Sequence, residues 1–199
     1  VNFLALLGWN PGDEREIFSM QALINEFSFE KIQKGGAIFN VKRLDWINGA
    51  YIRQKPPKEL AKLCLPYLVE AGLVKNDVDI ETIEPVVMLY QERLKKLSEI
   101  TELADFFFKE KLEYKKELLK WKDASNADIK ASLEKLETIL SEIEENKWTK
   151  EHLQEILLKE AEKTGDRGYM LWPMRVTLSG KQASAGPFEI AAVLGKEKT

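Results

Sequence analysis

The sequence has few of the side chains that bind metals or form covalent links. Its 199 residues include one cysteine, Cys64, and one histidine, His152. A single cysteine cannot form an internal disulfide, and these two side chains cannot supply the ligand set of a structural zinc site. Cys64 falls on an apolar helical stripe, so we expect it to be a core residue rather than a nucleophile. No partner nucleophile is recognisable for His152, and we expect it to be solvated or to cap a helix.

Long hydrophobic runs are also absent. The longest apolar stretches fall far short of a membrane span, and the N-terminal VNFLALLGW lacks both a basic leader and a small-residue cleavage site. We therefore expect a soluble, cytoplasmic monomer that makes no contact with membranes. The start at Val1, inside an apparent helix that ends at Gly8, suggests a piece of a longer chain.

Strand-like alternation of apolar and polar residues persists nowhere, and the chain has no internal repeat. It also lacks a glycine-rich phosphate loop, a G-x-S-x-G elbow and an H-E-x-x-H metal motif. Apolar residues recur at helical spacing through most of the sequence. The sequence therefore predicts an all-α fold with no recognisable catalytic residue and no metal site.

Four side chains are expected to cap the N-termini of helices: Ser19, Asn40, Asp79 and Thr149. The apolar stripe after Asp79 steps by four and three residues as far as Leu97, which predicts one helix from there to about residue 100. The charged text from 101 to 122 predicts further helix. The apolar face of the helix after Asn40 is expected to include Val41 and Trp46.

A second apolar helical face is expected between Pro57 and Gly72. Its members follow the spacing i, i+3, i+4, i+7 and i+8, which places them on one side of a helix: Leu60, Leu63, Cys64, Tyr67 and Leu68. We expect all five side chains to be buried.

Charge is unevenly distributed along the chain, although the formal net charge is only −3. Residues 30–62 contain eight bases and three acids, for a net charge of +5, whereas residues 127–163 contain six bases and ten acids, for −4. A basic first part, an acidic helical middle and an acid-free end would allow a polyanion to bind at two places while the acidic helices face solvent. The alternative is that these charges are simply scattered over a solvated surface.

The stretch from Gly168 to Gly195 follows the charged helical text, and no Asp or Glu occurs between Arg167 and Phe188. It combines cationic and aromatic residues: Arg167, Tyr169, Trp172, Arg175, Lys181 and Phe188. Such a stretch could accept a phosphate backbone and stacked bases without self-repulsion. Composition alone favours the alternative, a compact helical unit whose aromatic residues form its core.

Arg93 lies at the edge of the apolar stripe that follows Asp79. Its neighbours three and four residues away in both directions carry no acid, so it has no ion-pair partner within its own helix. Either a carboxylate from another helix pairs with it or it contacts a ligand. Both interpretations remain open from these residues alone.

A family resemblance is spread over nearly the whole chain. The L-D-W-I-N-G-x-Y-I-R and P-M-R-V-x-L-S-G blocks are its most specific parts, and the text from 105 to 145 is generic. The chain resembles the C-terminal, tRNA-binding part of bacterial-type glutamyl-tRNA synthetases, which are class I aminoacyl-tRNA synthetases. The matching text is FLALLGW at 3–9, EIFSMQALINEF at 16–27, GGAIFNVKRLDWINGAYIR at 35–53, LPYLVEAGL at 65–73, QERLKKLSEI at 91–100, PMRVTLSG at 173–180 and GPFEIAAVLG at 186–195.

This resemblance implies a parent enzyme that activates glutamate with ATP and Mg²⁺ and transfers it to the 3′ end of tRNA-Glu. That chemistry would belong to an N-terminal Rossmann-type domain with HIGH-like and KMSKS-like motifs, and neither motif occurs here. The chain itself would be non-catalytic and hold no cofactor. The implied organisation is a helical stem-contact unit (1–56) followed by two helical anticodon-binding subdomains that form an α-helix cage (57–145 and 146–199).

The resemblance also implies two sets of tRNA-contacting residues. The residues expected near stem phosphates or sugars are Lys31, Arg43, Trp46 and Arg53. The residues expected at the anticodon are Arg93, Arg175 and the turn formed by Ser184, Ala185, Gly186 and Pro187, which departs from the family's usual Pro-Gly-Leu type of turn. The alternative function is a helical scaffold or protein-interaction module that does not bind tRNA; a free-standing enzyme is disfavoured by the missing motifs.

Overall fold

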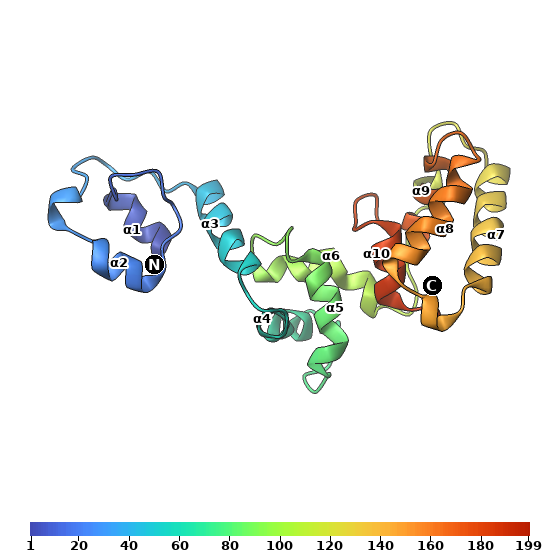
Figure 1. The fold of residues 1–199 in the computed structure, drawn as a ribbon, viewed down its shortest axis with the longest axis horizontal. Helices are drawn as coiled ribbons and strands as arrows, with labels where there is room; N and C mark the ends of the chain where they lie inside the picture. Colours follow the sequence, from blue (N-terminus) through green and yellow to red (C-terminus); the bar gives the residue numbers. More distant parts are fainter.

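The structure is a computed structural model that describes all 199 residues and contains no β-strand (Figure 1). Five short 3₁₀ turns lie between the helices, and an isolated antiparallel bridge pairs Trp9 with Ile32. The all-α prediction is confirmed. None of the helices combines the length and the apolar character that crossing a membrane requires. The ten α-helices are α1 (Asn2–Gly8), α2 (Met20–Glu26), α3 (Val41–Arg53), α4 (Pro57–Glu70), α5 (Ile80–Tyr90), α6 (Ile100–Ala104), α7 (Asn126–Glu142), α8 (Lys150–Glu162), α9 (Gly168–Ser179) and α10 (Pro187–Leu194).

The predicted caps are confirmed. Each of the four side chains accepts a hydrogen bond from a backbone N–H two or three residues further along, which satisfies a donor that the first helical turn leaves free. The donor–acceptor distances are 3.1 Å at Ser19, 3.2 Å at Asn40, 3.0 Å at Asp79 and 3.3 Å at Thr149. Local sequence therefore determines where α2, α3, α5 and α8 begin.

The helix predicted to run to about residue 100 ends at Tyr90 instead. The chain turns there, because the N–H groups of Arg93 and Leu94 both donate to the Tyr90 carbonyl, at 2.8 and 3.0 Å. The Glu99 carboxylate then accepts the N–H groups of Lys95 and Lys96, at 2.8 and 3.2 Å. The apolar spacing was correct, since Leu94 is fully buried, but the helical interpretation of residues 91–96 was wrong.

The prediction of a continuous helical region over 101–122 was also wrong. Only α6 is an α-helix there, and it is followed by the 3₁₀ turns Asp105–Phe108 and Lys116–Leu119. Phe106 and Phe107 are buried in the larger of the two hydrophobic cores described below, which is called the main core. The chain after them packs against α9 rather than forming a helix of its own, so tertiary contacts override local propensity.

Two predicted apolar faces were partly wrong. Val41 and Trp46 on α3 are exposed, and so are Leu63 and Tyr67 on α4. On α4 the buried side is formed by Leu60, Ala61, Cys64 and Leu68. The core-facing stripes of these helices are therefore narrower than the number of apolar residues suggested.

The side chains pack around two separate cores. A small core of six buried residues lies in the N-terminal part, and a larger core of 26 buried residues extends from Ile52 to Ala191. The small core is formed by Phe3, Leu6, Trp9, Phe18, Leu23 and Ile47. α7 packs chiefly on α9, and α8 packs on α10. The domain limits 1–56, 57–145 and 146–199 stay a prediction. The larger core extends across the boundary between residues 145 and 146.

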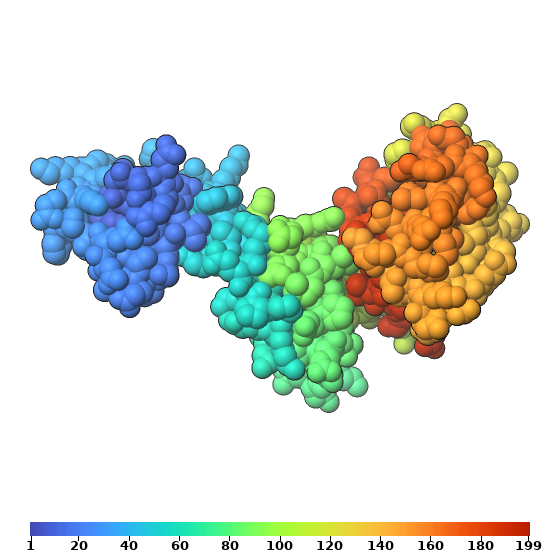
Figure 2. Space-filling view, in the orientation of Figure 1, coloured from blue at the N-terminus to red at the C-terminus, as the bar shows by residue number.

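The molecule is elongated. α1 and α2 lie at one end, α4 to α6 in the middle, and α7 to α9 at the other end, so that α3 connects the N-terminal part to the rest (Figure 1). The space-filling view shows the same order and a hollow in the outline between the two end parts (Figure 2). The two cores are therefore arranged along the length of the molecule.

Candidate nucleic-acid interface

Two arginines are each supported by an aromatic residue three positions earlier in the chain. Tyr90 precedes Arg93 at the end of α5, and Trp172 precedes Arg175 on α9. The guanidinium carbon of Arg93 lies 5.9 Å from the centroid of the Tyr90 ring, and that of Arg175 lies 4.6 Å from the Trp172 ring. A spacing of three residues places Trp172 and Arg175 on the same side of α9, and the turn that follows α5 brings Arg93 over the Tyr90 ring.

Both arginines donate to the same turn, which connects α9 to α10. Arg93 Nη1 donates to the carbonyl of Ser184 at 2.9 Å, and Arg175 Nη2 donates to the carbonyl of Gln182 at 3.3 Å. Arg93 is exposed and Arg175 half-buried, and neither forms an ion pair. A carboxylate from another helix, one of the two alternatives for Arg93, is therefore not its partner in the structure.

The other two cations of the acid-free stretch are neutralised. Arg167 pairs with Glu162 at 2.5 Å, and Lys181 pairs with Asp105 at 2.6 Å. Burial acts to raise the pKa of the Asp105 carboxyl, but hydrogen bonds from Lys109 and Lys181 outweigh it and lower that pKa. Arg175 is thus the one cation between Arg167 and Phe188 that has no carboxylate partner.

Gln182 and Ala183 are exposed in the turn, and Ser184 is half-buried. Ala185 is buried in the main core, so its methyl group is directed away from any ligand. Gly186 is the N-cap of α10 and Pro187 is its first residue. A Cβ atom at Gly186 would lie 2.0 Å from Oε2 of Glu189, so this position admits only glycine unless Glu189 moves.

The aromatic residues of the C-terminal stretch do not behave alike. Phe188 is buried, as a core role predicts, whereas Trp172 is half-buried and contacts Arg175. Neither the contact of Tyr90 with Arg93 nor the hydrogen bond from Arg175 to the Gln182 carbonyl was predicted from the sequence. The aromatic residue three positions before each arginine was the signal that could have identified Tyr90.

Three of the predicted stem-contact residues lie on one side of α3. Arg43, Trp46 and Arg53 are separated by three and seven residues, which brings them to the same helical face. Arg43 pairs with Glu16 at 2.6 Å, Trp46 is exposed, and Arg53 approaches the exposed carboxylate of Glu92 at 4.0 Å. The face therefore combines two surface cations with an exposed indole.

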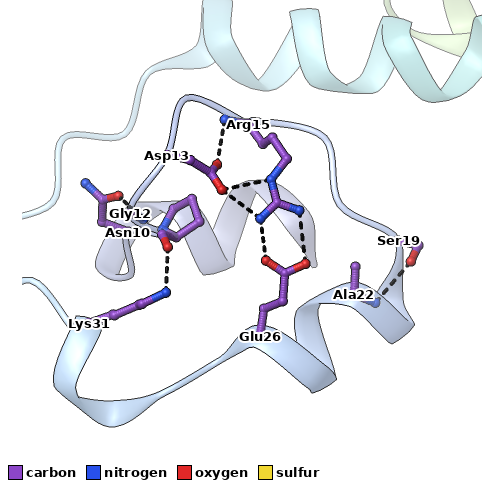
Figure 3. Close-up of polar contacts among 9 residues, drawn as sticks. Asn10, Gly12, Asp13, Arg15, Ser19, Ala22, Glu26 and Lys31 are labelled. Atoms are coloured by element: carbon purple, nitrogen blue, oxygen red, sulfur yellow. Dashed lines mark hydrogen bonds and ion pairs between the residues drawn. The ribbon is translucent and has the colours of Figure 1, made fainter.

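Lys31 is separate from that face. It is the last residue of the 3₁₀ turn Phe29–Lys31, which follows α2 (Figure 3). Its ammonium donates to the carbonyl of Pro11 at 2.6 Å. Beside it, the Arg15 guanidinium bridges the carboxylates of Asp13 and Glu26, at 2.7 and 2.5 Å (Figure 3). The structure therefore uses Lys31 to hold the loop, and the +5 segment retains three cations without a carboxylate or carbonyl partner: Lys34, Lys42 and Lys62.

The two residues considered for catalysis occupy unreactive positions. Cys64 is fully buried, and burial raises the pKa of its thiol to about 12. His152 lies in the first turn of α8, where its backbone N–H donates to the Thr149 side chain. No group of three or more His, Cys, Asp and Glu side chains is arranged to hold a metal ion.

Comparison with known proteins identifies the family of this chain. The family described as "Anticodon binding domain" matches residues 59–199, which is more than half of the chain. The chain belongs to the anticodon-binding domain family. The match begins within α4 and includes Arg93, Arg175 and the turn between α9 and α10.

Curated relatives extend the similarity to the N-terminal residues. The glutamate–tRNA ligase of Clostridium botulinum (strain Hall) is 42% identical over 205 residues, which cover 100% of this chain and 40% of that protein. The glutamate–tRNA ligase of Clostridium tetani is also 42% identical, with the same coverage. Glutamate–tRNA ligase 1 of Caldicellulosiruptor saccharolyticus is 38% identical over 99% of this chain. The chain thus spans about 40% of the length of the curated relatives it matches.

Solved structures agree with this assignment. A glutamate–tRNA ligase from Elizabethkingia meningosepticum, in complex with its amino acid, superimposes with a TM-score of 0.83 at 25% identity over 99% of this chain and 38% of that one. The glutamate–tRNA synthetase of Elizabethkingia anophelis gives a TM-score of 0.77 at 25% identity over 98% of this chain and 37% of that one. The predicted resemblance is confirmed: this chain of the anticodon-binding family is homologous to the C-terminal anticodon-binding portion of glutamate–tRNA ligases.

Proposed function

We propose that the chain binds tRNA-Glu as a monomer in the cytoplasm, and that Arg93, Arg175 and the turn from Gln182 to Pro187 contact the anticodon. The observation that carries the proposal is the convergence of two arginines without carboxylate partners on one turn. Each guanidinium has five N–H donors, and the structure assigns one hydrogen bond to each. Donors therefore remain for a base or a phosphate.

The chemistry of an unpaired base suits this arrangement. A guanidinium plane can stack on a base and donate two hydrogen bonds to its edge, and proteins generally read RNA sequence in single-stranded loops. The aromatic ring beneath each arginine supports the guanidinium without neutralising its charge. A base contact of this kind is worth about 1–3 kcal/mol of discrimination against the wrong base.

The N-terminal part would contribute affinity that does not depend on sequence. The Arg43–Glu16 and Arg53–Glu92 pairs are exposed, and such pairs typically stabilise a protein by only about 0–1 kcal/mol. A tRNA phosphate could therefore replace either carboxylate at little cost, with the exposed Trp46 beside them available for a sugar or base. Lys31 would have to leave the Pro11 carbonyl to join them, which makes it the weakest member of the predicted set.

The activity we propose for the whole protein is ATP-dependent glutamylation of tRNA-Glu, with Mg²⁺, by a catalytic portion outside this chain. The support is homology to glutamate–tRNA ligases over the full length of the chain. Within the chain we propose no catalytic residue and no cofactor. Its contribution is to hold the anticodon end of tRNA-Glu so that the 3′ end is presented to that catalytic portion.

A titration of the chain with tRNA-Glu and with anticodon-substituted versions, at two salt concentrations, tests the proposal. Arg93→Ala and Arg175→Ala should each weaken binding to tRNA-Glu by about 5-fold to 150-fold and reduce discrimination between the anticodon versions. Lys42→Ala is the matched control, because Lys42 is an exposed cation without an ion pair. It should weaken binding to every version alike and reduce the slope of log affinity against log salt by about 1.

Two results would contradict the proposal. If both arginine variants distinguished the anticodon versions as well as the parent chain does, the anticodon site would lie elsewhere. If the chain bound no tRNA and instead bound a protein partner with little dependence on salt, the scaffold alternative would replace the proposed function.

A further inference from the structure

The side chain of Trp172, which supports Arg175, is held by the segment of the chain between α6 and α7. The Trp172 indole Nε1 donates to the carbonyl of Leu118 at 2.7 Å, and its ring lies 5.2 Å from the ring of Trp121. Leu118 and Trp121 belong to residues 109–125, here called the strap, which connects the 3₁₀ turn after α6 to α7. Arg175 and the strap thus both contact one indole.

Three polar contacts fix the strap to the beginning of α9. The Asp166 carboxylate accepts Trp121 Nε1 at 3.2 Å and Lys122 Nζ at 2.6 Å. The Tyr169 hydroxyl donates to Asp123 of the strap. The indole of Trp121 is therefore held in place by a hydrogen bond at its edge and by polar contacts on the residues that follow it.

Gly168 provides the space that Trp121 occupies. A Cβ atom at this position would lie 2.1 Å from both Nε1 and Cε2 of the Trp121 ring, which no packing arrangement permits. Gly168 is the first residue of α9 and does not have a positive φ. Its backbone conformation therefore does not require glycine, and the close approach of Trp121 does.

We propose that Trp121 is a positioning residue for Arg175: it fixes the Trp172 ring, on which the Arg175 guanidinium rests while it donates to Gln182. The proposal rests on the proposed function of Arg175 at the anticodon. Without Trp121, the Trp172 side chain can adopt more rotamers and no longer supports Arg175 firmly. Base binding must then order both side chains, and the loss of conformational entropy weakens binding. Discrimination between anticodons should fall even though Trp121 itself does not touch the RNA.

A double-mutant cycle tests this dependence. Measured on the full chain, the ratio of Kd for an anticodon-substituted tRNA to Kd for tRNA-Glu should fall by about tenfold in Trp121→Ala, or ~1.4 kcal/mol. In the Arg175→Ala background, Trp121→Ala should leave that ratio unchanged, because Trp121 acts through Arg175. Trp121→Phe, which keeps a ring against Trp172, should retain most of the discrimination.

Gly168→Ala gives the same test without removing any side chain of the network. The variant creates no cavity, and helices favour alanine over glycine, which offsets part of the cost of displacing Trp121. It should lower the Kd ratio by displacing Trp121, and again it should have no effect in the Arg175→Ala background. Trp148→Ala is the matched control, because Trp148 is another half-buried tryptophan whose Nε1 donates to a backbone carbonyl, that of Ala191 at 2.9 Å. It should leave the ratio unchanged.

The outcomes separate this inference from the function on which it rests. If Arg175→Ala lowers the ratio but Trp121→Ala and Gly168→Ala do not, the positioning role is wrong and the anticodon site stands. An equal fall in the Arg175→Ala background would mean that Trp121 acts independently, which also overturns the inference. If Arg175→Ala itself leaves the ratio unchanged, both proposals are overturned.

Discussion

Arg93 and Arg175 each contact an aromatic ring and have no carboxylate partner, so their charges are not neutralised. A carboxylate neutralises a cation, as Glu162 does for Arg167, whereas a ring supports a guanidinium and leaves its charge and most of its N–H groups available. Arg93 and Arg175 have rings, and their remaining hydrogen bonds are to neutral carbonyls. At the scale of residues, this choice of partner distinguishes the candidate site from the rest of the acid-rich surface.

Asp166 makes the anchor of Trp121 sensitive to acid. The hydrogen bond from Lys122, then those from the Gly168 N–H and Trp121, lower the pKa of Asp166 to about 2. Because the folded-state pKa lies below the unfolded value of about 3.9, the stabilisation is present above that value and is lost as pH falls toward 2. Near-ultraviolet circular dichroism of the tryptophans should weaken between about pH 4 and pH 2.

Asp166→Asn should show a weakened tryptophan signal already at neutral pH and less further change on acidification. Asp77→Asn is the control, because Asp77 is exposed and its side chain accepts no hydrogen bond in the structure. An Asp166→Asn protein whose spectrum and acid transition matched those of the parent would show that this carboxylate does not hold Trp121.

At the scale of elements, one amide connects α3 to the segment that carries Arg93. Gln91 is buried, and its Nε2 donates to the carbonyls of Ile52, Arg53 and Lys55, at 3.0, 3.3 and 2.9 Å. These carbonyls lie at and just beyond the C-terminal end of α3, where helical carbonyls have no partner within the helix, and the Ile52 carbonyl also accepts the Lys55 N–H at 3.1 Å. Gln91 thus caps α3 and fixes the position of the turn that contains Arg93.

Gln91→Met should lower the free energy of unfolding of the main core by about 1–3 kcal/mol, since it keeps the side-chain length but removes the side-chain donor to the carbonyls of Arg53 and Lys55. Urea titration followed by circular dichroism measures this change. Gln54→Met is the control, because Gln54 is exposed beside the same carbonyls. Equal stability of both variants would show that water satisfies these carbonyls and that Gln91 does not hold α3 to the turn that contains Arg93.

Local sequence predicted the beginnings of elements better than their ends. The caps at Ser19, Asn40, Asp79 and Thr149 depend on a side chain and a backbone N–H within three residues, so the sequence contains all the information. The turn after α5 and the irregular strap are also held by partners 36 to 54 residues away, namely the carbonyls to which Gln91 and Trp172 donate. No local pattern contains those partners.

The candidate site could also be predicted only in part from the sequence. Motif position identified Arg93 and Arg175, which are separated by more than eighty residues, but it did not indicate that they share a turn or how they are supported. Gln182 and Trp121 carried no signal, since a polar turn residue and an aromatic residue in charged text are both ordinary. Their roles follow from the packing of α9 against the strap.

At the scale of the whole molecule, the two cores differ greatly in size. The N-terminal core has six buried residues against 26 in the main core, and eleven of the thirteen large hydrophobic residues that are exposed lie within residues 1–46. Small cores bury little apolar surface per residue and are correspondingly marginal. The N-terminal part should therefore open more readily than the rest.

Native-state hydrogen exchange of the full chain should show this difference. Amides of α1 and α2 should exchange at least about tenfold faster than those of α4, α5 and α9, whose buried residues belong to the main core. Equal protection across both parts would mean that the chain unfolds as a single unit and that the N-terminal core is not the weaker one.

The turn between α9 and α10, with Arg93 and Arg175, is the proposed contact for the anticodon. Nuclease probing of tRNA-Glu saturated with the chain tests this contact. We predict protection of the anticodon nucleotides by the parent chain, and loss of that protection in the Arg93→Ala/Arg175→Ala variant while contacts elsewhere on the tRNA persist. Anticodon nucleotides cleaved equally with and without saturating parent chain, or protected equally by the double variant, would contradict the account.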